Sequence, residues 1–201
     1  MFDKKILLTA LGSLALVAGS ASAATIWSDD FGYAAANDDP PTPTQIAANE
    51  AGMDANGWDT PGTFGSDYGV TNGGALWGNG GVAMPLLTAS TGHILADGDD
   101  IELTINVNRV GGYSYGYEFF AWDGVTATSL GGGTHTGTPS GTYTASASAA
   151  HVGQELIFTY VHSVNWGETD SLSVDVEPIP EPGSLALLGL GGLLIARRRR
   201  G

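Results

Sequence analysis

The sequence predicts an all-β protein: an antiparallel β-sandwich of jelly-roll type, flanked by an N-terminal signal helix and a short C-terminal transmembrane helix. Three observations favour this fold class. Apolar and polar residues alternate with a period of two in several short segments, which is typical of strands with one buried face. Glycine-rich clusters separate these segments, and the central part of the chain has no helical periodicity longer than two turns. Regular short strands joined by such turns are typical of sandwiches and jelly rolls.

The N-terminus has the features of a secretory signal peptide over residues 1–23. Lys4 and Lys5 supply positive charge, residues 6–18 form an apolar run broken only by small residues, and residues 21–23 (Ala-Ser-Ala) match the A-x-A cleavage pattern. A buried N-terminal helix would explain the apolar run but not the order of the three features. We therefore expect cleavage after Ala23 and export of a chain that begins at Ala24.

Residues 24–96 carry the weaker strand signals of the body. Residues 26–27 are expected to begin a first strand, and residues 38–43, with two aspartates and three prolines, form a loop. Residues 45–53 are compatible with a short helix. Residues 58–81 are rich in glycine, aspartate and aromatic residues, and their pattern assigns no strand boundaries.

The second part of the body has clear strand signals. Residues 101–107 and 171–177 alternate apolar with polar side chains, whereas residues 156–161 are apolar on both faces, which indicates a central strand. We predict strands at 101–107, 117–122, 142–148, 156–161 and 171–177, and turns at 111–112, 123–124, 131–133 and 138–141. No linker divides the body, so residues 24–177 are expected to form one acidic domain.

Charge and composition exclude several classes of function. The chain of 201 residues has a formal net charge of −14, and residues 24–182 carry 20 acidic residues against one base, Arg109, a net charge of −19. Such a body repels the phosphates of nucleic acids and of anionic membranes. The sequence has no cysteine, which excludes disulfides, thiolate zinc sites and cysteine nucleophiles.

The C-terminus contains a proline-rich linker, an apolar segment and a basic stop. Residues 177–182 (Glu-Pro-Ile-Pro-Glu-Pro) disfavour helix and predict an extended linker. The apolar run 183–196 spans about 21 Å as a helix, less than the roughly 30 Å of bilayer hydrocarbon. The four arginines 197–200 can snorkel toward the headgroups and would hold their end in the cytoplasm. The predicted orientation leaves the acidic body outside.

Residues 178–201 resemble the PEP-CTERM sorting signal of Gram-negative bacteria. The matching features are Pro180, Glu181 and Pro182, the short Leu/Gly/Ala helix, and the cluster of Arg197, Arg198, Arg199 and Arg200. The resemblance implies export by the secretion machinery, transient anchoring in the inner membrane, and processing by an exosortase near Pro-Glu-Pro. It further implies delivery to the cell surface or extracellular matrix. The alternative is an ordinary C-terminal anchor.

The body resembles galactose-binding-like sandwiches in four segments: 27–31 (Trp-Ser-Asp-Asp-Phe), 142–144, 153–156 and 170–176. The resemblance implies a module that binds carbohydrate or another surface. It also implies a structural calcium that ties the first strand to the last, which nominates Asp30 and Asp175 as ligands. No other cofactor is expected. The acidic clusters at 97–102 and 168–170 offer further oxygen ligands for calcium, although a solvated loop explains them equally.

Three tryptophans are candidate carbohydrate contacts. Trp58, Trp77 and Trp166 lie in loop-like contexts, and a flat aromatic face can pack against a sugar ring while nearby polar groups bond its hydroxyls. The alternative is that these rings fill a core that has few aliphatic residues.

The sequence carries no catalytic signature. The four histidines lack metal-ligand spacing, and the acids of 97–102 superficially resemble a jelly-roll glucanase strand that Gly98 interrupts. We therefore expect a non-catalytic surface or matrix protein that binds exopolysaccharide or has a structural role. The alternatives are a glycoside hydrolase or lyase that uses Glu102 or Glu118, and a passive coat protein whose acidity keeps the surface hydrated.

Overall fold

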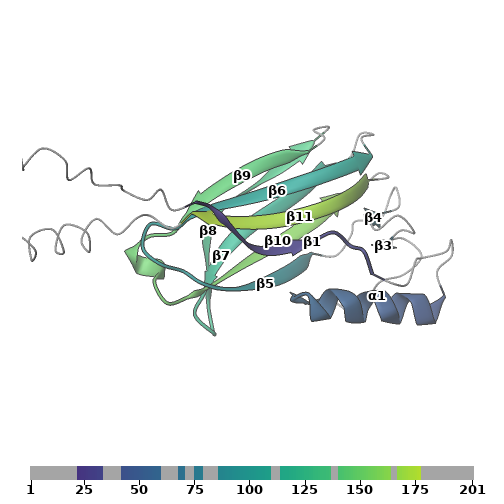
Figure 1. Cartoon of the computed structure of the whole chain (residues 1–201), viewed down its shortest axis with the longest axis horizontal. Coiled ribbons are helices and arrows are strands. Elements are labelled where there is room, and N and C mark those ends of the chain that lie inside the picture. The colour runs from purple at the N-terminus through teal and green to yellow at the C-terminus, as the bar shows by residue number, and fades with distance from the viewer. Residues whose placement is uncertain are drawn as a thin grey trace, which may run out of the picture. The chain divides into compact units, whose positions relative to one another are not determined.

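The described part of the chain is a two-sheet antiparallel sandwich (Figure 1). The computed structural model describes residues 22–33, 42–59, 68–70, 75–78, 86–109, 114–136, 140–163 and 167–177, all within one compact unit, Ser22–Ile179. The predicted all-β class is thereby confirmed. Residues 1–21 of the expected signal segment 1–23, and the whole of the expected helix 183–196, lie outside these residues. Among the residues that are described, no helix is long and apolar enough to cross a membrane.

The first sheet, sheet A, is organised around the last strand of the chain. Its order is β3 (Tyr68–Val70), β4 (Leu76–Gly78), β11 (Gly167–Glu177), β6 (Asp100–Arg109) and β9 (Gly141–Ser146). Strand β6 pairs along one edge of β11, while β4 and then β1 (Ala24–Asp29) pair along its other edge. The first and last strands of the sandwich therefore lie side by side (Figure 1).

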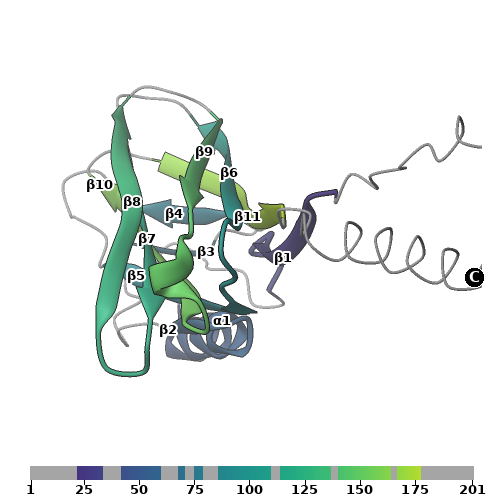
Figure 2. The ribbon, with the colours of Figure 1, turned by 90° about the vertical axis from the view of Figure 1, so that its left-hand side faces the viewer.

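The second sheet, sheet B, has the order β2 (Trp58–Asp59), β5 (Leu87–Ile94), β10 (Glu155–Ser163), β7 (Ser114–Trp122) and β8 (Ala127–Thr136). Strand β10 is the central strand of the five, as its apolar character on both faces predicts. Figure 2 shows β7 and β8 on one side of the sandwich and β6 and β9 on the other.

Alternate side chains of both sheets form the core. The apolar residues of β6 and β11 that alternate with polar ones in the sequence are buried, as are Leu156, Phe158 and Tyr160 of β10. Five aromatic rings make one contiguous cluster between the sheets, with edge-to-face and stacked contacts that favour close packing. The cluster consists of Trp27, Phe31, Trp58, Phe119 and Phe158.

The short helix expected at 45–53 is α1 (Pro43–Ala55), which contacts β2 and β3. Thr42 caps it: its Oγ1 accepts from the backbone N–H of Gln45 at 3.3 Å, and Gln45 Oε1 accepts from the Thr42 N–H at 2.8 Å. Proline is favoured at the first helical position because its missing N–H has no partner there. Of the loop expected at 38–43, Pro43 is helical, Thr42 caps the helix, and residues 38–41 lie outside the described part of the chain. A second helical segment, η1 (Ala149–His151), is a 3-10 turn.

The turn predicted at 131–133 is wrong, because these glycines lie inside β8. A Cβ on Gly132 would lie 2.5 Å from the carbonyl oxygen of Tyr117 on the paired strand. Gly132 thus permits a close approach of β8 to β7, and the three glycines do not mark a chain reversal. The reversal lies at the predicted 123–124 turn, where Asp123 Oδ1 accepts from the backbone N–H groups of Val125 (2.8 Å) and Thr126 (2.7 Å). These bonds, chiefly the one from Thr126, lower the pKa of Asp123.

Strands β5 and β8 were not predicted from the sequence, and β9 ends at Ser146, two residues before the predicted end. The short strands β2, β3 and β4 lie in residues 58–81, where the pattern assigned no strand. Strands β5 and β8 are rich in threonine, serine and glycine, so their hydrophobic alternation is weak.

Candidate functional site

Trp58 lies in the core and offers no ring face to a ligand. Its side chain is 3% exposed, and its ring packs against Trp27 at 5.2 Å and Phe158 at 5.5 Å between centroids. The expectation of a carbohydrate contact at Trp58 is therefore corrected, because β2 turns this ring toward the opposite sheet. Trp77 lies in β4, but its side chain is outside the described residues, as is the whole of Trp166.

Asp29 is a buried carboxylate with a structural role. It is 4% exposed, and it accepts hydrogen bonds from the Trp58 indole N–H at 2.6 Å, the Phe31 backbone N–H at 2.7 Å, and the Tyr33 hydroxyl. Burial of the phenol and its bond to Asp29 raise the pKa of Tyr33 well above its usual range. A hollow of about 500 Å³ lies beside this cluster, but the Asp29 carboxylate is already engaged by three internal donors.

The two acids nominated for calcium do not meet. Asp175 pairs with Thr25 at the start of β1, whereas Asp30 follows Asp29, which pairs with Leu172. Three residues of strand separate Leu172 from Asp175, roughly 10 Å. The register of β1 with β11 therefore places Asp30 and Asp175 at different levels of the strand pair. Across the described residues, no group of three or more His, Asp or Glu is placed to hold a metal.

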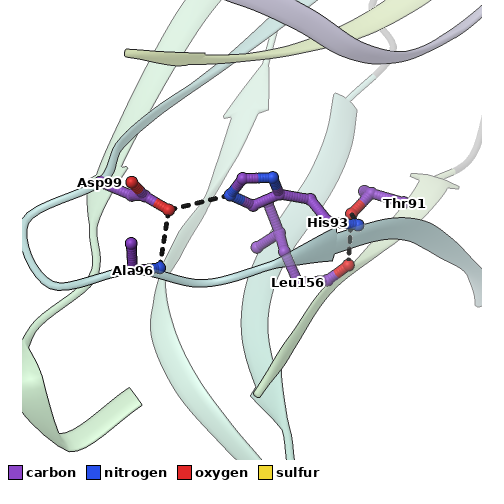
Figure 3. Close-up of polar contacts among 5 residues, drawn as sticks. All are labelled: Thr91, His93, Ala96, Asp99 and Leu156. Atoms are coloured by element: carbon purple, nitrogen blue, oxygen red, sulfur yellow. Dashed lines mark hydrogen bonds and ion pairs between the residues drawn. The ribbon is translucent and has the colours of Figure 1, made fainter. Parts of the chain in front are cut away.

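The acidic cluster at 97–102 divides between a structural role and solvent. Asp99 is 2% exposed and closes the corner between β5 and β6, where its Oδ2 accepts from the Ala96 backbone N–H at 2.9 Å and lies 2.8 Å from His93 Nε2 (Figure 3). Thr91 anchors the same end of β5 by donating to the Leu156 carbonyl at 2.7 Å (Figure 3). Asp99 is therefore not available as a ligand or as a catalytic acid.

On the outer face of sheet A, the described side chains that β6 and β9 and the 171–177 part of β11 present at paired positions are polar. Its middle row consists of hydroxyl groups from four strands, and carboxylates gather at one end, where Glu102 lies opposite Asp175 and Asp100 opposite Glu177. The hydroxyl row consists of Thr142, Thr104, Ser173 and Ser28. These described side chains are hydrophilic and suit contact with water.

The outer face of sheet B differs, because aromatic and aliphatic side chains lie on it. Phe120 and Trp122 of β7 point away from the buried Phe119 and Ala121 and are partly exposed. Ile157 of β10 lies directly opposite Phe120, and Ile94 of β5, in the row of Trp122, is 56% exposed. We call this surface the aromatic face, defined by Ile94, Phe120, Trp122 and Ile157.

Two carboxylates flank the aromatic face, and serines hold them in place. Glu118 Oε1 accepts from the Ser129 hydroxyl at 2.6 Å, and Glu155 Oε1 accepts from the Ser90 hydroxyl. Ser129 belongs to β8 and Ser90 to β5, which are separated by the two strands that carry Phe120 and Ile157. The serines therefore hold the carboxylates on opposite sides of this apolar pair, with their anchoring strands roughly 14 Å apart.

A hollow of about 360 Å³ continues the aromatic face beyond Glu118. It exists because Gly116 and Gly132 present no side chain there, while Thr134, Thr159 and Val161 line its walls. The aromatic face and this hollow together form an open surface with apolar rings, carboxylates and hydroxyls, the combination that orients a polyhydroxylated ligand.

Sequence reasoning missed Phe120 and Trp122 as surface residues. Their shared parity was readable from residues 117–122, a nearly continuous aromatic run. A run that is apolar at both parities does not reveal which parity faces the core. Only the packing of Phe119 against Phe158 shows that Phe120 and Trp122 face outward.

The nominated hydrolase acids lie on opposite sides of the molecule. Glu102 is on the outer face of sheet A, and Glu118 is on the outer face of sheet B. Packed sheets are about 10 Å apart and these side chains point away from each other. Glycosidase carboxylates lie about 5–9.5 Å apart, so Glu102 and Glu118 cannot act as a catalytic pair.

These features define the class of protein: an acidic two-sheet β-sandwich with aromatic side chains on the outer face of sheet B, joined to a terminal sorting segment. Residues 178–200 match the family described as the PEP-CTERM protein-sorting motif. The motif marks the chain as an exported protein that is processed at the membrane by an exosortase. No curated protein matches the chain.

Several solved structures that are similar to the body are carbohydrate-binding modules. The CBM22-1 xylan-binding domain of Paenibacillus barcinonensis Xyn10C has a TM-score of 0.44 at 12% identity, covering 78% of this chain and 96% of that domain. The CBM1 domain of BiXyn10A has a TM-score of 0.35 at 13% identity over 77% and 92%. A CBM4 domain has a TM-score of 0.32 at 14% identity, covering 56% of this chain and 76% of that domain. Likenesses of this size do not identify a ligand for this chain.

Proposed function

We propose that the protein is a non-catalytic module that binds a polysaccharide chain on the aromatic face, at the cell surface or in the extracellular matrix. The observation that carries the proposal is the outward position of Phe120 and Trp122 on one strand, with Ile157 opposite Phe120. Aromatic rings that stay partly exposed on a folded sandwich give a sugar ring an apolar platform. The serine-held carboxylates beside them are acceptors for sugar hydroxyls.

The proposal is tested by substituting one ring of the platform. The purified protein is titrated with the exopolysaccharide of its own host, and Trp122→Ala is compared with Val125→Ala. Val125 is 85% exposed in the adjacent β7–β8 turn and serves as a control for loss of exposed apolar surface. We expect Trp122→Ala to weaken binding at least about tenfold, as truncation of a central aromatic anchor does. Equal binding by both variants would refute the platform.

The alternative function, a glycoside hydrolase, is tested by measuring the release of reducing ends from the polysaccharide. On the aromatic face, Glu118 and Glu155 are the two carboxylates nearest the rings, and their serines hold them on opposite sides of the apolar pair. We expect no release of reducing ends from the bound polysaccharide over a prolonged incubation. Release that disappears in Glu118→Gln would support the hydrolase.

Delivery to the surface is proposed from the terminal segments. Cleavage after Ala23 would begin the mature chain at Ala24, the first residue of β1, so that the pairing of Ala24 with Val176 is kept. Pro180, Glu181 and Pro182 and the arginines 197–200 are proposed to be required for exosortase processing. The intact mass of the surface protein tests this: a mature chain still ending at Gly201 would contradict it.

A further inference from the structure

We infer that the aromatic face selects a polysaccharide carrying protonated amino groups, in preference to a neutral or an acidic one. The inference rests on the proposed function and specifies the class of chain that binds. Its basis is the charge that surrounds the aromatic rings, which the platform itself does not require. A platform of Phe120 and Trp122 alone would accept any sugar with an exposed apolar side.

Around the aromatic face, the charged side chains that the described residues place on the outer face of sheet B are all acidic. Glu155 lies directly opposite Trp122, Glu118 lies two residues from Phe120 on the same strand, and Asp59 lies in the row of Glu118, opposite Thr88. No lysine or arginine occurs among the described residues of sheet B, β2, β5, β7, β8 and β10. A chain lying across Phe120 and Trp122 therefore meets carboxylates on both sides.

The two serine bonds keep these carboxylates able to bind a cation. A carboxylate accepts about four hydrogen bonds, and each of Ser129 and Ser90 contributes one. The hydroxyls fix the carboxylates at the edges of the apolar pair, and acceptor sites remain for an ammonium group. An amino sugar stacked on Phe120 or Trp122 would place its charged substituent toward Glu118 or Glu155.

The remainder of the molecule reinforces this preference. Residues 24–182 carry a net charge of −19, which attracts a polycation and repels a polyanion before contact. The long-range part is screened beyond about 8 Å at physiological ionic strength, whereas contacts made on the face persist. Each exposed ion pair of this kind changes affinity by about 1.5- to 5-fold.

The test compares three polymers that share a β-1,4-linked glucose-type backbone and differ in charge. The purified protein is titrated at pH 5.5 with chitosan, hydroxyethylcellulose and carboxymethylcellulose, at low and at high salt. We expect chitosan to bind most tightly and carboxymethylcellulose least, with the difference shrinking as salt rises. Binding of hydroxyethylcellulose as tight as that of chitosan at low salt would overturn the inference.

Substitutions distinguish binding that depends on the carboxylates beside the aromatic face from nonspecific attraction of a polycation to an acidic protein. Glu118→Gln and Glu155→Gln are each expected to lower the ratio of chitosan affinity to hydroxyethylcellulose affinity by about 1.5- to 5-fold. Glu102→Gln removes the same charge from the outer face of sheet A and is the matched control. An equal fall in this ratio for Glu102→Gln would overturn the inference. Two carboxylate variants are used, each checked by circular dichroism, so that misfolding of one does not decide the result.

Trp122→Ala distinguishes the two proposals. If Trp122→Ala no longer binds any of the three polymers and the wild-type protein shows no preference for chitosan, the aromatic binding site is supported. The selection of charged amino sugars is then refuted. If Trp122→Ala binds every polymer as the wild-type protein does, the proposed function itself fails.

Discussion

The indole N–H of Trp58 donates to Asp29 Oδ2 at 2.6 Å inside the sandwich. This bond joins the end of the first strand to the short strand β2 of the opposite sheet. It fixes Trp58 in the core and gives the buried Asp29 carboxylate one of its three donors. The segment 27–31, which resembles galactose-binding-like sandwiches in sequence, therefore serves the packing of the two sheets.

Removing the Asp29 carboxylate is expected to destabilise the fold. Asp29→Ala leaves the Trp58 and Phe31 N–H groups without their acceptor, and unsatisfied buried donors cost about 1–3 kcal/mol each. We expect the free energy of unfolding to fall by about 2–4 kcal/mol, measured by urea denaturation. Asp30→Ala, which loses only the bond from the Gly32 N–H, is the control and is expected to change little. Equal effects of both variants would contradict a structural role specific to Asp29.

Alkaline pH is expected to weaken the same cluster through Tyr33. Burial and the bond to Asp29 raise the pKa of Tyr33 above the ordinary value of 10.0. A group whose pKa is raised in the folded state stabilises the fold below its unfolded pKa, and this stabilisation is lost as pH rises. Stability should therefore decline above pH 10, and Tyr33→Phe should show a shallower decline. Denaturation curves between pH 8 and pH 12 compare the two, and identical slopes would exclude Tyr33 as the cause.

Neutralising one acid on the outer face of sheet A is expected to stabilise the protein. Glu102 lies directly opposite Asp175, and like charges in opposite positions destabilise a strand pair. Glu102→Gln should raise the free energy of unfolding by about 0.2–1 kcal/mol at low salt, with a smaller gain at high salt. Asp59→Asn is the control, because Asp59 lies opposite the uncharged Thr88. Thermal unfolding at two salt concentrations measures both, and a gain independent of salt would argue against repulsion.

A side chain at Gly132 is expected to disturb the pairing of β8 with β7. The added Cβ would lie 2.5 Å from the Tyr117 carbonyl oxygen and 2.8 Å from the Glu118 Cα. Because both contacts are with backbone atoms, the strands must separate, and we expect Gly132→Ala to cost about 1–3 kcal/mol. Thr136→Ala, at an exposed position of the same strand, should be nearly neutral. Hydrogen exchange of β8 amides should accelerate in Gly132→Ala only, and unchanged exchange would show that β8 tolerates the methyl group.

Several elements followed from the sequence because local pattern was sufficient to specify them. Strict alternation at 101–107 and 171–177 determined β6 and β11, since a period of two places every second side chain in the core whatever the partner strand. The run apolar on both faces at 156–161 identified the central strand of sheet B. The linker, the arginine cluster and the absence of cysteine also required no fold to interpret. The PEP-CTERM motif at 178–200 is confirmed.

Other features depended on which strand lies beside which. The glycines 131–133 are indistinguishable from a turn until the approach of β8 to Tyr117 is known. Trp58 is indistinguishable from a surface ring until β2 pairs with β5 and turns it inward. Asp30 and Asp175 were expected to meet because the first and last strands adjoin; the strands do adjoin, but their register separates the two acids.

The sequence by itself determined the class of fold, the acidity of the body, and the sorting motif at its C-terminus, because these depend on local periodicity, charge and short motifs. The aromatic face was decided by the tertiary structure. Phe119 and Phe120 are identical residues next to each other, and one is buried while the other faces outward. Which one faces outward depends on the side from which sheet A packs, and that long-range contact leaves no local trace in the sequence.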